Sequence, residues 1–306
     1  MTAVAGAPPG EQGRQATRRG SRRADRTKRW AVLLELGPFT VLYLVVFVAP
    51  LAILVIYSFF RRARGGAVIP AFQLDAYVKV LTDPLFYRVL VNTIVIGLAT
   101  AVACVVIAYA FVYVVNFLFP RWKGAVIFLV LVSLFAGYLA RIYAWRTLLG
   151  LEGVINSFLV GVGIVDEPLR FLLFSQFAVV VTMLSIYLPF AVLPINAAMQ
   201  NVGRELVEAS RDLGAGRITA FRTVTMPMSY AGFRAALLFC FLLSAGDYVT
   251  PALVGGPDSL MIGVVIRDQF YAANNWPLGA ALAVVTVVFV LLIFVVIDSL
   301  TRLALR

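Results

Sequence analysis

The chain has 306 residues, of which 62% are hydrophobic and 13% are charged, and its net charge is +11. Soluble domains are about half apolar and a quarter charged, so this composition excludes a water-soluble globular protein and indicates an integral membrane protein. No histidine is present, which excludes histidine acid–base catalysis, Ser-His-Asp triads and histidine-ligated metal sites.

Residues 1–30 are rich in Gly, Ala, Arg and Ser, which predicts a disordered basic tail. Eight basic residues lie between Arg14 and Arg29. They fit either a contact with anionic lipid or a topogenic signal that keeps the N-terminus in the cytoplasm. The apolar run that follows is too long for the core of a signal peptide, so we expect it to be retained. Residues 31–306 then form a single membrane domain.

Six apolar segments are long enough to cross a bilayer as helices, which takes roughly 20 residues each. They are 33–60, 89–117, 124–147, 172–196, 232–254 and 277–301. Strands of a membrane barrel would be shorter and would alternate in polarity. The expected fold is therefore an all-α integral membrane protein with six transmembrane helices.

Six spans place both termini on the same side of the membrane. With the basic tail in the cytoplasm, the inner loops are 118–123 and 197–231, in agreement with the positive-inside rule. The expected outer loops are 61–88, 148–171 and 255–276. The run of arginines that begins at Arg61 departs from the rule, but the first helix and its tail usually dominate the orientation.

The largest cytoplasmic loop contains a predicted amphipathic helix. Apolar residues recur at intervals of three and four residues: Leu206, Ala209 and Leu213. This pattern gives one apolar helical face. Glu208 has the spacing of an intrahelical ion pair with both Arg204 and Arg211.

Glycines at 214 and 216 predict a tight turn after this helix, because glycine readily adopts positive φ. A second short apolar stripe follows, and Pro227 is expected to end it before the next span. A connector that rests on the bilayer and a docking element that transmits force both fit this helix–turn–helix.

The same stretch carries a resemblance to a known family. Glu208-Ala209-Ser210, three residues, Gly214, nine residues and then Val224-Thr225-Met226-Pro227 resemble the E-A-A, G, I-x-L-P motif of the permease subunits of ABC importers. The resemblance implies a coupling helix in 204–227, between the fourth and fifth spans, that docks into a groove on an ATPase subunit. It assigns that contact to the following residues: Glu208, Ala209, Arg211, Asp212, Gly214 and Pro227.

Four further stretches resemble the first permease of spermidine/putrescine-type importers. They are RIYAWRTLLGLEGVIN (141–156), DEPLRFLL (166–173), YLPFAVLPI (187–195) and GDYVTPALVGGPDSLMIG (246–263). The resemblance implies a bacterial inner-membrane location and three kinds of partner: a second permease chain, an ATPase dimer and an extracytoplasmic solute-binding protein. The outer loops 148–171 and 255–276 would help to dock the binding protein. A polyamine is the expected solute, while aminoalkyl phosphonates, other amines, oxyanions and iron stay open.

The chain contains no G-x-x-x-x-G-K-S/T segment to bind nucleotide phosphates. We therefore expect no enzyme activity and no cofactor on this chain, with ATP and Mg²⁺ bound by the partner ATPase subunits. Cys104 and Cys240 lie in separate apolar segments without a C-x-x-C pattern, so they are expected to be packing residues rather than metal ligands. The basic charge is explained by membrane orientation, and no nucleic-acid partner is expected.

Asp247 is a candidate for the solute path, because ionisable side chains within spans are costly and usually face the interior of the bundle. Aromatic rings that could contact a cationic solute are Tyr143, Trp145 and Tyr248. The alternative is a structural ion pair of Asp247 with Arg141 or Arg146, and an Arg141 pair that opens during transport would place both residues in the path.

Other residues within the spans are candidates for structural roles or for the solute path. Tyr109, Tyr113 and Asn116 recur at helical spacing in the second span, where they either face a cavity or form interhelical hydrogen bonds. Asn92 is expected to cap that span. Pro189 and Pro194 predict a bent fourth span.

Two other functions remain open on the sequence. A secondary transporter would need an ionisable relay within the spans, for which only Asp247 and Asp298 are available. A non-transporting scaffold or receptor would not need a coupling loop, and the sequence shows no signalling domain.

Overall fold

The computed structural model describes residues 37–63 and 65–303, so the predicted N-terminal tail lies outside the described residues. The chain divides into two compact units, and the boundary between them in the sequence lies after Ile56. The described part of the first unit belongs to one apolar helix, Gly37–Tyr57, which contains a π-helical turn at Leu44–Val48 and continues as α2, Ala49–Tyr57. This helix lies within the first predicted span.

The second unit begins with a short antiparallel hairpin in which β1, Arg61–Arg62, pairs with β2, Val68–Ile69. Helix α3, Asp75–Thr82, follows. The first predicted outer loop therefore contains ordered elements.

Helix α4, Pro84–Phe117, begins five residues before the second predicted span. The side chain of Asp83 caps it by accepting a hydrogen bond from the Leu85 N–H at 3.0 Å. The sequence Asp-Pro is a strong start signal, because aspartate favours the cap and proline favours the first helical position. Asn92 therefore lies inside the helix, and its predicted capping role is wrong.

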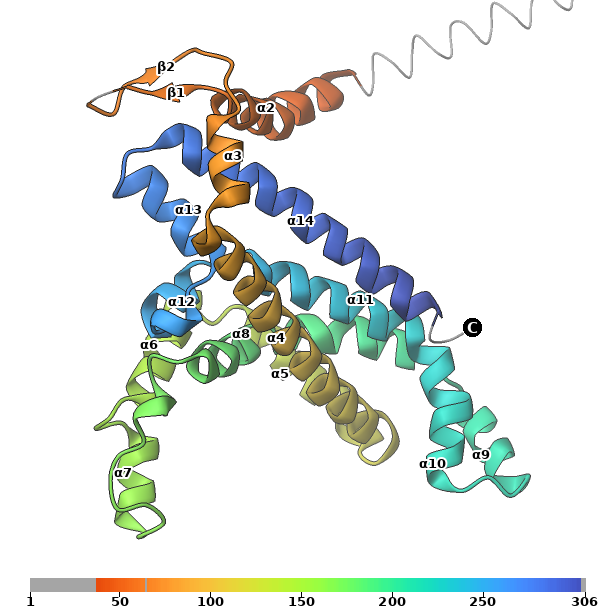
Figure 1. Ribbon diagram of the computed structural model, residues 1–306. Coiled ribbons are helices and arrows are strands. Elements are labelled where there is room, and N and C mark those ends of the chain that lie inside the picture. The colour runs from red at the N-terminus through yellow and green to blue at the C-terminus, as the bar shows by residue number, and fades with distance from the viewer. Residues whose placement is uncertain (1–36, 64, 304–306) are drawn as a thin grey trace, which may run out of the picture. The chain divides into compact units, whose positions relative to one another are not determined.

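The third predicted span is a bent pair of helices. After a 3-10 turn at Pro120–Trp122, α5, Lys123–Leu134, is followed by α6, Tyr138–Leu149, and the two segments meet at 94°. Gly137 precedes α6 with extended backbone angles, and glycine is a weak helix former. The prediction of one continuous helix over 124–147 is wrong, although the bent pair is still a candidate span. Helix α7, Val154–Gly161, extends beyond α6 (Figure 1).

Helix α8, Gln176–Met199, follows a 3-10 turn at Arg170–Leu172 and corresponds to the fourth predicted span. Ser175 caps it by accepting from the Ala178 N–H at 3.1 Å. Both predicted prolines lie inside this helix.

The loop after α8 contains α9, Arg204–Asp212, and then a helical run that reaches the next span without interruption. This run comprises α10, Arg217–Ala220, a π-helical turn at Phe221–Thr225 and α11, Met226–Ala245. Pro227 lies in the first turn of α11, so the prediction that it ends the preceding helix is wrong. A proline ring crowds the carbonyl of the preceding turn, and a widened π turn accommodates such crowding.

The C-terminal part contains α12, Val249–Val254, a 3-10 turn at Pro257–Ser259, α13, Ile262–Tyr271, and α14, Trp276–Leu303. Residues 246–248 separate α11 from α12. The fifth predicted span, 232–254, is therefore broken near its end, whereas the sixth matches α14.

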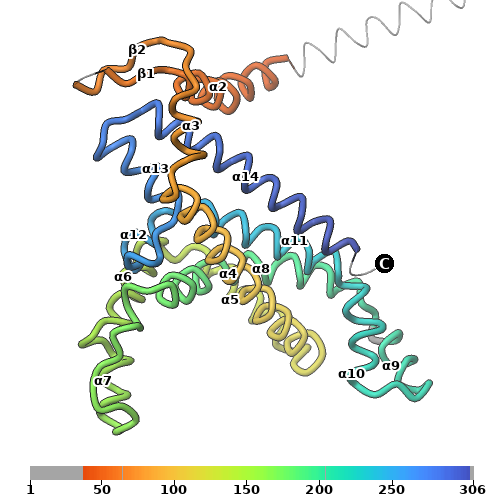
Figure 2. Tube along the Cα trace, viewed as in Figure 1, coloured from red at the N-terminus to blue at the C-terminus, as the bar shows by residue number. Residues whose placement is uncertain are grey.

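Helices α4, α8 and α11 pack against one another and form the main core, which buries Cys104 and Cys240 as expected. A Cβ on Gly232 of α11 would overlap the Pro194 carbonyl of α8, so a small residue is required where the two helices meet. A second cluster joins α3, α4, α13 and α14. Figures 1 and 2 show α9 and α10 at the opposite end of α11 from α12.

Within the described residues, five helices are long and apolar enough to cross a membrane, and the bent pair is a sixth candidate. They are Gly37–Tyr57, Pro84–Phe117, Gln176–Met199, Arg217–Ala245 and Trp276–Leu303. The prediction of an all-α membrane protein is confirmed.

Candidate functional site

The glycine turn after α9 has the geometry that the motif predicts. Gly214 has φ of +88°, in the left-handed region where side chains are disfavoured. Its N–H donates to the Arg211 carbonyl at 2.9 Å, and the Ala215 N–H donates to the Ser210 carbonyl at 3.1 Å. These bonds satisfy the last carbonyls of α9, as in other helices that end at a left-handed glycine.

The motif residues lie on the surface of the described chain. Glu208, Ala209, Gly214 and Pro227 are all exposed. Two large apolar side chains beside them, Leu213 and Ile218, are 90% and 76% exposed. Apolar side chains this exposed at the tip of a loop indicate a contact with another molecule or with the membrane.

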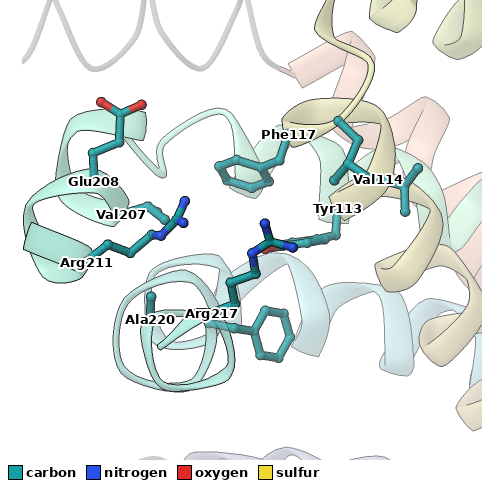
Figure 3. Close-up of a pocket in the computed structure, with 10 residues that line it drawn as sticks. Tyr113, Val114, Phe117, Val207, Glu208, Arg211, Arg217 and Ala220 are labelled. Atoms are coloured by element: carbon teal, nitrogen blue, oxygen red, sulfur yellow. The ribbon is translucent and has the colours of Figure 1, made fainter. Parts of the chain in front are cut away.

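The predicted ion pair between Glu208 and Arg211 is wrong. Among the described side chains, no ion pair joins these two residues, and Figure 3 shows the carboxylate and the guanidinium pointing apart. An exposed helical pair contributes only about 0.3–0.5 kcal/mol, which is too little to fix two long side chains. The Arg204 side chain lies outside the described part.

A groove of about 530 Å³ separates this loop from the end of α4. Its lining residues are Tyr113, Val114, Phe117, Leu118, Val207, Glu208, Arg211, Arg217, Ala220 and Phe221. Figure 3 shows Arg211 and Arg217 directed toward the α4 side of the groove. The groove therefore combines apolar walls with two cationic groups.

Aromatic contacts connect the loop to α4. The Phe221 ring makes edge contacts with Tyr109 and Tyr113, at centroid distances of 5.7 and 5.5 Å. The Tyr109 hydroxyl hydrogen-bonds the Ser229 hydroxyl at 2.5 Å. Asn116 donates to the Asn196 side chain of α8 at 3.2 Å. These residues thus make the interhelical contacts that were one of the two predicted uses.

Asp247 is buried in the break between α11 and α12, with only 6% of its surface exposed. Its Oδ1 accepts hydrogen bonds from the Val249 N–H at 2.9 Å, the Thr250 N–H at 3.1 Å and the Tyr138 hydroxyl at 2.6 Å. Its Oδ2 accepts from the Thr250 hydroxyl at 2.5 Å and the Tyr187 hydroxyl at 3.0 Å. Asp247 therefore accepts from the first two N–H groups of α12 and links this helix to α6 and α8.

The alternative ion pair of Asp247 with an arginine is wrong. No arginine of the described chain lies within ion-pair distance of Asp247. The Arg141 guanidinium instead donates to the Ser185 carbonyl at 3.3 Å and the Ser133 hydroxyl at 3.2 Å, and Arg146 lies over the Phe174 ring. Five hydrogen bonds from uncharged N–H and O–H groups stabilise the carboxylate in place of a cation.

The predicted aromatic residues lie apart. Trp145 donates its indole N–H to the Ser185 hydroxyl at 2.7 Å, which places it with Arg141 against α8. Tyr143 and Tyr248 are 52% and 45% exposed. No ring contact joins these three residues within the described structure.

Sequence reasoning missed Tyr138, Tyr187 and Thr250 as partners of Asp247. Thr250 follows Asp247 by three residues, and aspartate before a short helix is a capping signal that was available. Tyr138 and Tyr187 are 109 and 60 residues away, so no local pattern indicates them.

Asn92 and Asp298 each contact residues that are distant in the sequence. Asn92 donates to the Asp258 and Leu260 carbonyls at 3.0 and 2.9 Å, and thereby fixes the loop before α13 to α4. Asp298 pairs with Arg234 at 3.0 Å and with Arg302 at 2.9 Å.

The structure thus combines helical spans, an exposed E-A-A-type loop with a left-handed glycine and a polar break near the far end of the fifth span. Residues 36–306 match the family described as binding-protein-dependent transport system inner membrane component. The chain therefore belongs to this family of ABC importer permeases and is a multi-pass inner-membrane protein. This membership supersedes the secondary-transporter and scaffold hypotheses.

More particularly, the chain is similar to a permease of polyamine transport. It is 33% identical over 255 residues to the spermidine/putrescine transport system permease protein PotB of Escherichia coli (strain K12), which covers 83% of this chain and 92% of that protein. It is also 30% identical over 230 residues to the inner membrane ABC transporter permease protein YdcU of the same organism, covering 71% and 72% of the two chains.

Solved structures share the fold. A chain of a bacterial ABC transporter involved in the import of the acidic polysaccharide alginate aligns with a TM-score of 0.76 and 17% identity. The alignment covers 94% of this chain and all of that one. At this identity the likeness shows the fold alone.

Proposed function

We propose that this chain forms one half of the membrane path of a polyamine importer and couples through residues 204–227 to ATPase subunits on other chains. The observation that carries the coupling role is the exposed helix–turn–helix, in which Gly214 adopts the required left-handed conformation. Its second helix is continuous with the membrane-spanning α11. A movement of the loop is thereby passed directly to a transmembrane helix.

The coupling mechanism follows from this continuity. ATP binding closes the ATPase dimer, and Glu208, Ala209, Arg211 and Asp212 move with the surface to which α9 is docked. Since α10 and α11 are one helical run, the span follows and the path opens outward. Hydrolysis resets the cycle. ATP and the delivered solute must favour different states for such a switch to work.

The partners of this arrangement are other macromolecules and the bilayer. A second permease, encoded as a different chain, completes the path, and ATP and Mg²⁺ bind to the ATPase subunits. A solute-binding protein docks on the outer face at 148–171 and 255–276. Both termini of this chain lie in the cytoplasm, in accordance with the basic N-terminal tail.

The solute class is proposed from the relatives, because PotB is named as a permease of spermidine/putrescine transport. The hydrogen bonds of Asp247 restrict which groups can bind the ammonium groups of the solute. All five donors around Asp247 belong to this chain, so its carboxylate has little capacity left for an ammonium group. The exposed rings of Tyr143 and Tyr248 offer π faces to a cation. The carboxylates that select a polyamine then come from the partner permease and the binding protein.

Purification of the tagged complex from its native membrane, followed by reconstitution into liposomes, tests this proposal. We expect a P-loop ATPase to co-purify and labelled spermidine or putrescine to be taken up only with ATP and the binding protein. Uptake of an aminoalkyl phosphonate or an oxyanion in place of polyamines would refute the solute class. Isolation of the chain without an ATPase from several mild detergents would refute the coupling role.

A further inference from the structure

The groove between the coupling loop and α4 has two kinds of wall. Arg211 and Arg217 come from the loop, on either side of the Gly214 turn. Val114 and Leu118 come from the last turns of a membrane-spanning helix and are 39% and 60% exposed. A ligand that fits must therefore carry negative charge at one end and apolar surface at the other.

The two arginines of the groove are not neutralised by the described part of the chain. Neither guanidinium group makes an ion pair or a hydrogen bond there. Figure 3 shows their guanidinium groups on the side that faces Tyr113 and Phe117, whereas the Glu208 carboxylate points away. Two guanidinium groups directed into one groove repel each other and attract a phosphate or carboxylate, to which arginine binds in a bidentate manner.

The position of the groove distinguishes between these anions. It lies at the end of α4, where exposed Phe119 and Trp122 follow directly in the chain and are 56% and 65% exposed. Aromatic side chains gather where a helix leaves the hydrocarbon layer. The apolar wall therefore lies at the level of acyl chains and the arginines at the level of headgroups. Basic pockets beside membrane helices on the cytoplasmic side bind anionic lipid headgroups.

We propose that this groove binds one anionic phospholipid. Its phosphate contacts Arg211 and Arg217, and the upper part of an acyl chain lies along Val114 and Leu118. The lipid bridges the coupling loop and the span, so that it adds to the aromatic contacts of Phe221. Lipid binding does not depend on the proposed function, because it requires only the two arginines and the apolar wall.

Native mass spectrometry of the purified complex tests the binding. The probe is phosphatidylglycerol, added to complexes in a detergent with phosphatidylcholine as the neutral comparison. We expect wild-type complexes to retain one phosphatidylglycerol more tightly than any phosphatidylcholine. The double variant R211Q/R217Q should bind it about 25-fold more weakly, since each basic contact contributes roughly fivefold. The double variant R211K/R217K keeps the charge and should lie between them.

Arg121→Gln is the matched control, because Arg121 is an exposed arginine close to the groove that does not line it. It should leave the retained lipid unchanged. Size-exclusion profiles show whether each variant folds, and the lysine pair allows the test if the glutamine pair does not fold.

Three results would overturn the proposal. Equal retention in the wild type and R211Q/R217Q would show that the lipid binds elsewhere. Displacement of the lipid by millimolar inorganic phosphate would show a site for a free anion. Unchanged lipid retention together with loss of the ATPase subunit from R211Q/R217Q would assign the groove to an acidic segment of that subunit. These measurements require no transport, so the lipid proposal can be refuted even if polyamine uptake is confirmed.

Discussion

Substitutions of Asp247 test whether this residue stabilises the break between α11 and α12 or attracts a cationic solute. Asp247→Ala removes both acceptor oxygens. Asp247→Asn keeps one oxygen in the same place and removes only the charge and the second acceptor. The two variants therefore separate hydrogen bonding from charge.

The expected loss of stability follows from the donors that each variant leaves without an acceptor. In Asp247→Ala these include the backbone N–H groups of Val249 and Thr250, which cannot rotate toward another acceptor. A buried donor without a partner costs about 1–3 kcal/mol, so the pair costs about 2–6 kcal/mol. Hydroxyl groups can reorient, and Tyr138 already lies 3.3 Å from the Thr250 hydroxyl. In Asp247→Asn the remaining oxygen serves both N–H groups, and the expected loss is about 1–2 kcal/mol.

Thermal midpoints of the purified complex, measured by size-exclusion fluorescence, provide the assay. At roughly 2 °C per kcal/mol, Asp247→Ala should lower the midpoint by about 4–12 °C and Asp247→Asn by about 2–4 °C. Uptake should follow stability, so that Asn retains most of the activity and Ala little. Asp75→Ala serves as the control, because Asp75 is exposed, lies outside the two proposed docking loops and makes no ion pair within the described part of the chain.

A different pattern would refute this reasoning. If Asp247 acts through its charge, both variants should lose uptake of a cationic solute to the same extent while their midpoints equal that of the wild type. An Asp247→Ala midpoint within 1 °C of the wild type, at roughly the precision of the assay, would show that the five hydrogen bonds contribute little.

Three further substitutions test other parts of the structure. Gly214→Trp should abolish uptake while the protein still folds, since the turn is exposed and no atom of the described chain lies within 4 Å of an added Cβ; Gly214→Ala places a side chain at the same positive φ without a ring and controls for backbone strain, and normal uptake by the Trp variant would refute docking there. Gly232→Leu should prevent folding, whereas Ala231→Leu on the exposed face should not, as expression and size-exclusion profiles will show. Asn92→Ala should lower the thermal midpoint by the equivalent of about 1–3 kcal/mol, and an unchanged midpoint would show that its two bonds to the α13 loop are dispensable.

The transmembrane helices were largely predictable, because a bilayer requires roughly 20 apolar residues irrespective of what surrounds them. Five of the six predicted segments overlap long apolar helices of the structure, and the ends of the fourth and sixth agree within a few residues. The coupling-type loop was predictable for a related reason. Its left-handed turn depends on Gly214 and its neighbours alone.

The wrong predictions share one physical cause. The composition of a segment does not show in which direction the chain turns or which distant residue a side chain meets. The 94° bend after Leu134 lies in the apolar stretch Phe135-Ala136-Gly137. The break at Gly246 adjoins the charged Asp247, but this charge does not show in which direction the chain turns. Asp247 was recognised as exceptional, but its partners Tyr138 and Tyr187 come from other helices. Asn92 was assigned to the nearest helix end, because the carbonyl groups that it binds lie more than 160 residues away.

The uninterrupted helix from Arg217 to Ala245 has a geometric consequence. Its 29 residues form a rod about 43 Å long, so a tilt of about 10° at the coupling end displaces the other end by about 7 Å. That displacement exceeds the length of any hydrogen bond at Asp247. When this helix tilts, the hydrogen bonds around the Asp247 carboxylate therefore either stay intact, so that the helix rotates about them, or break.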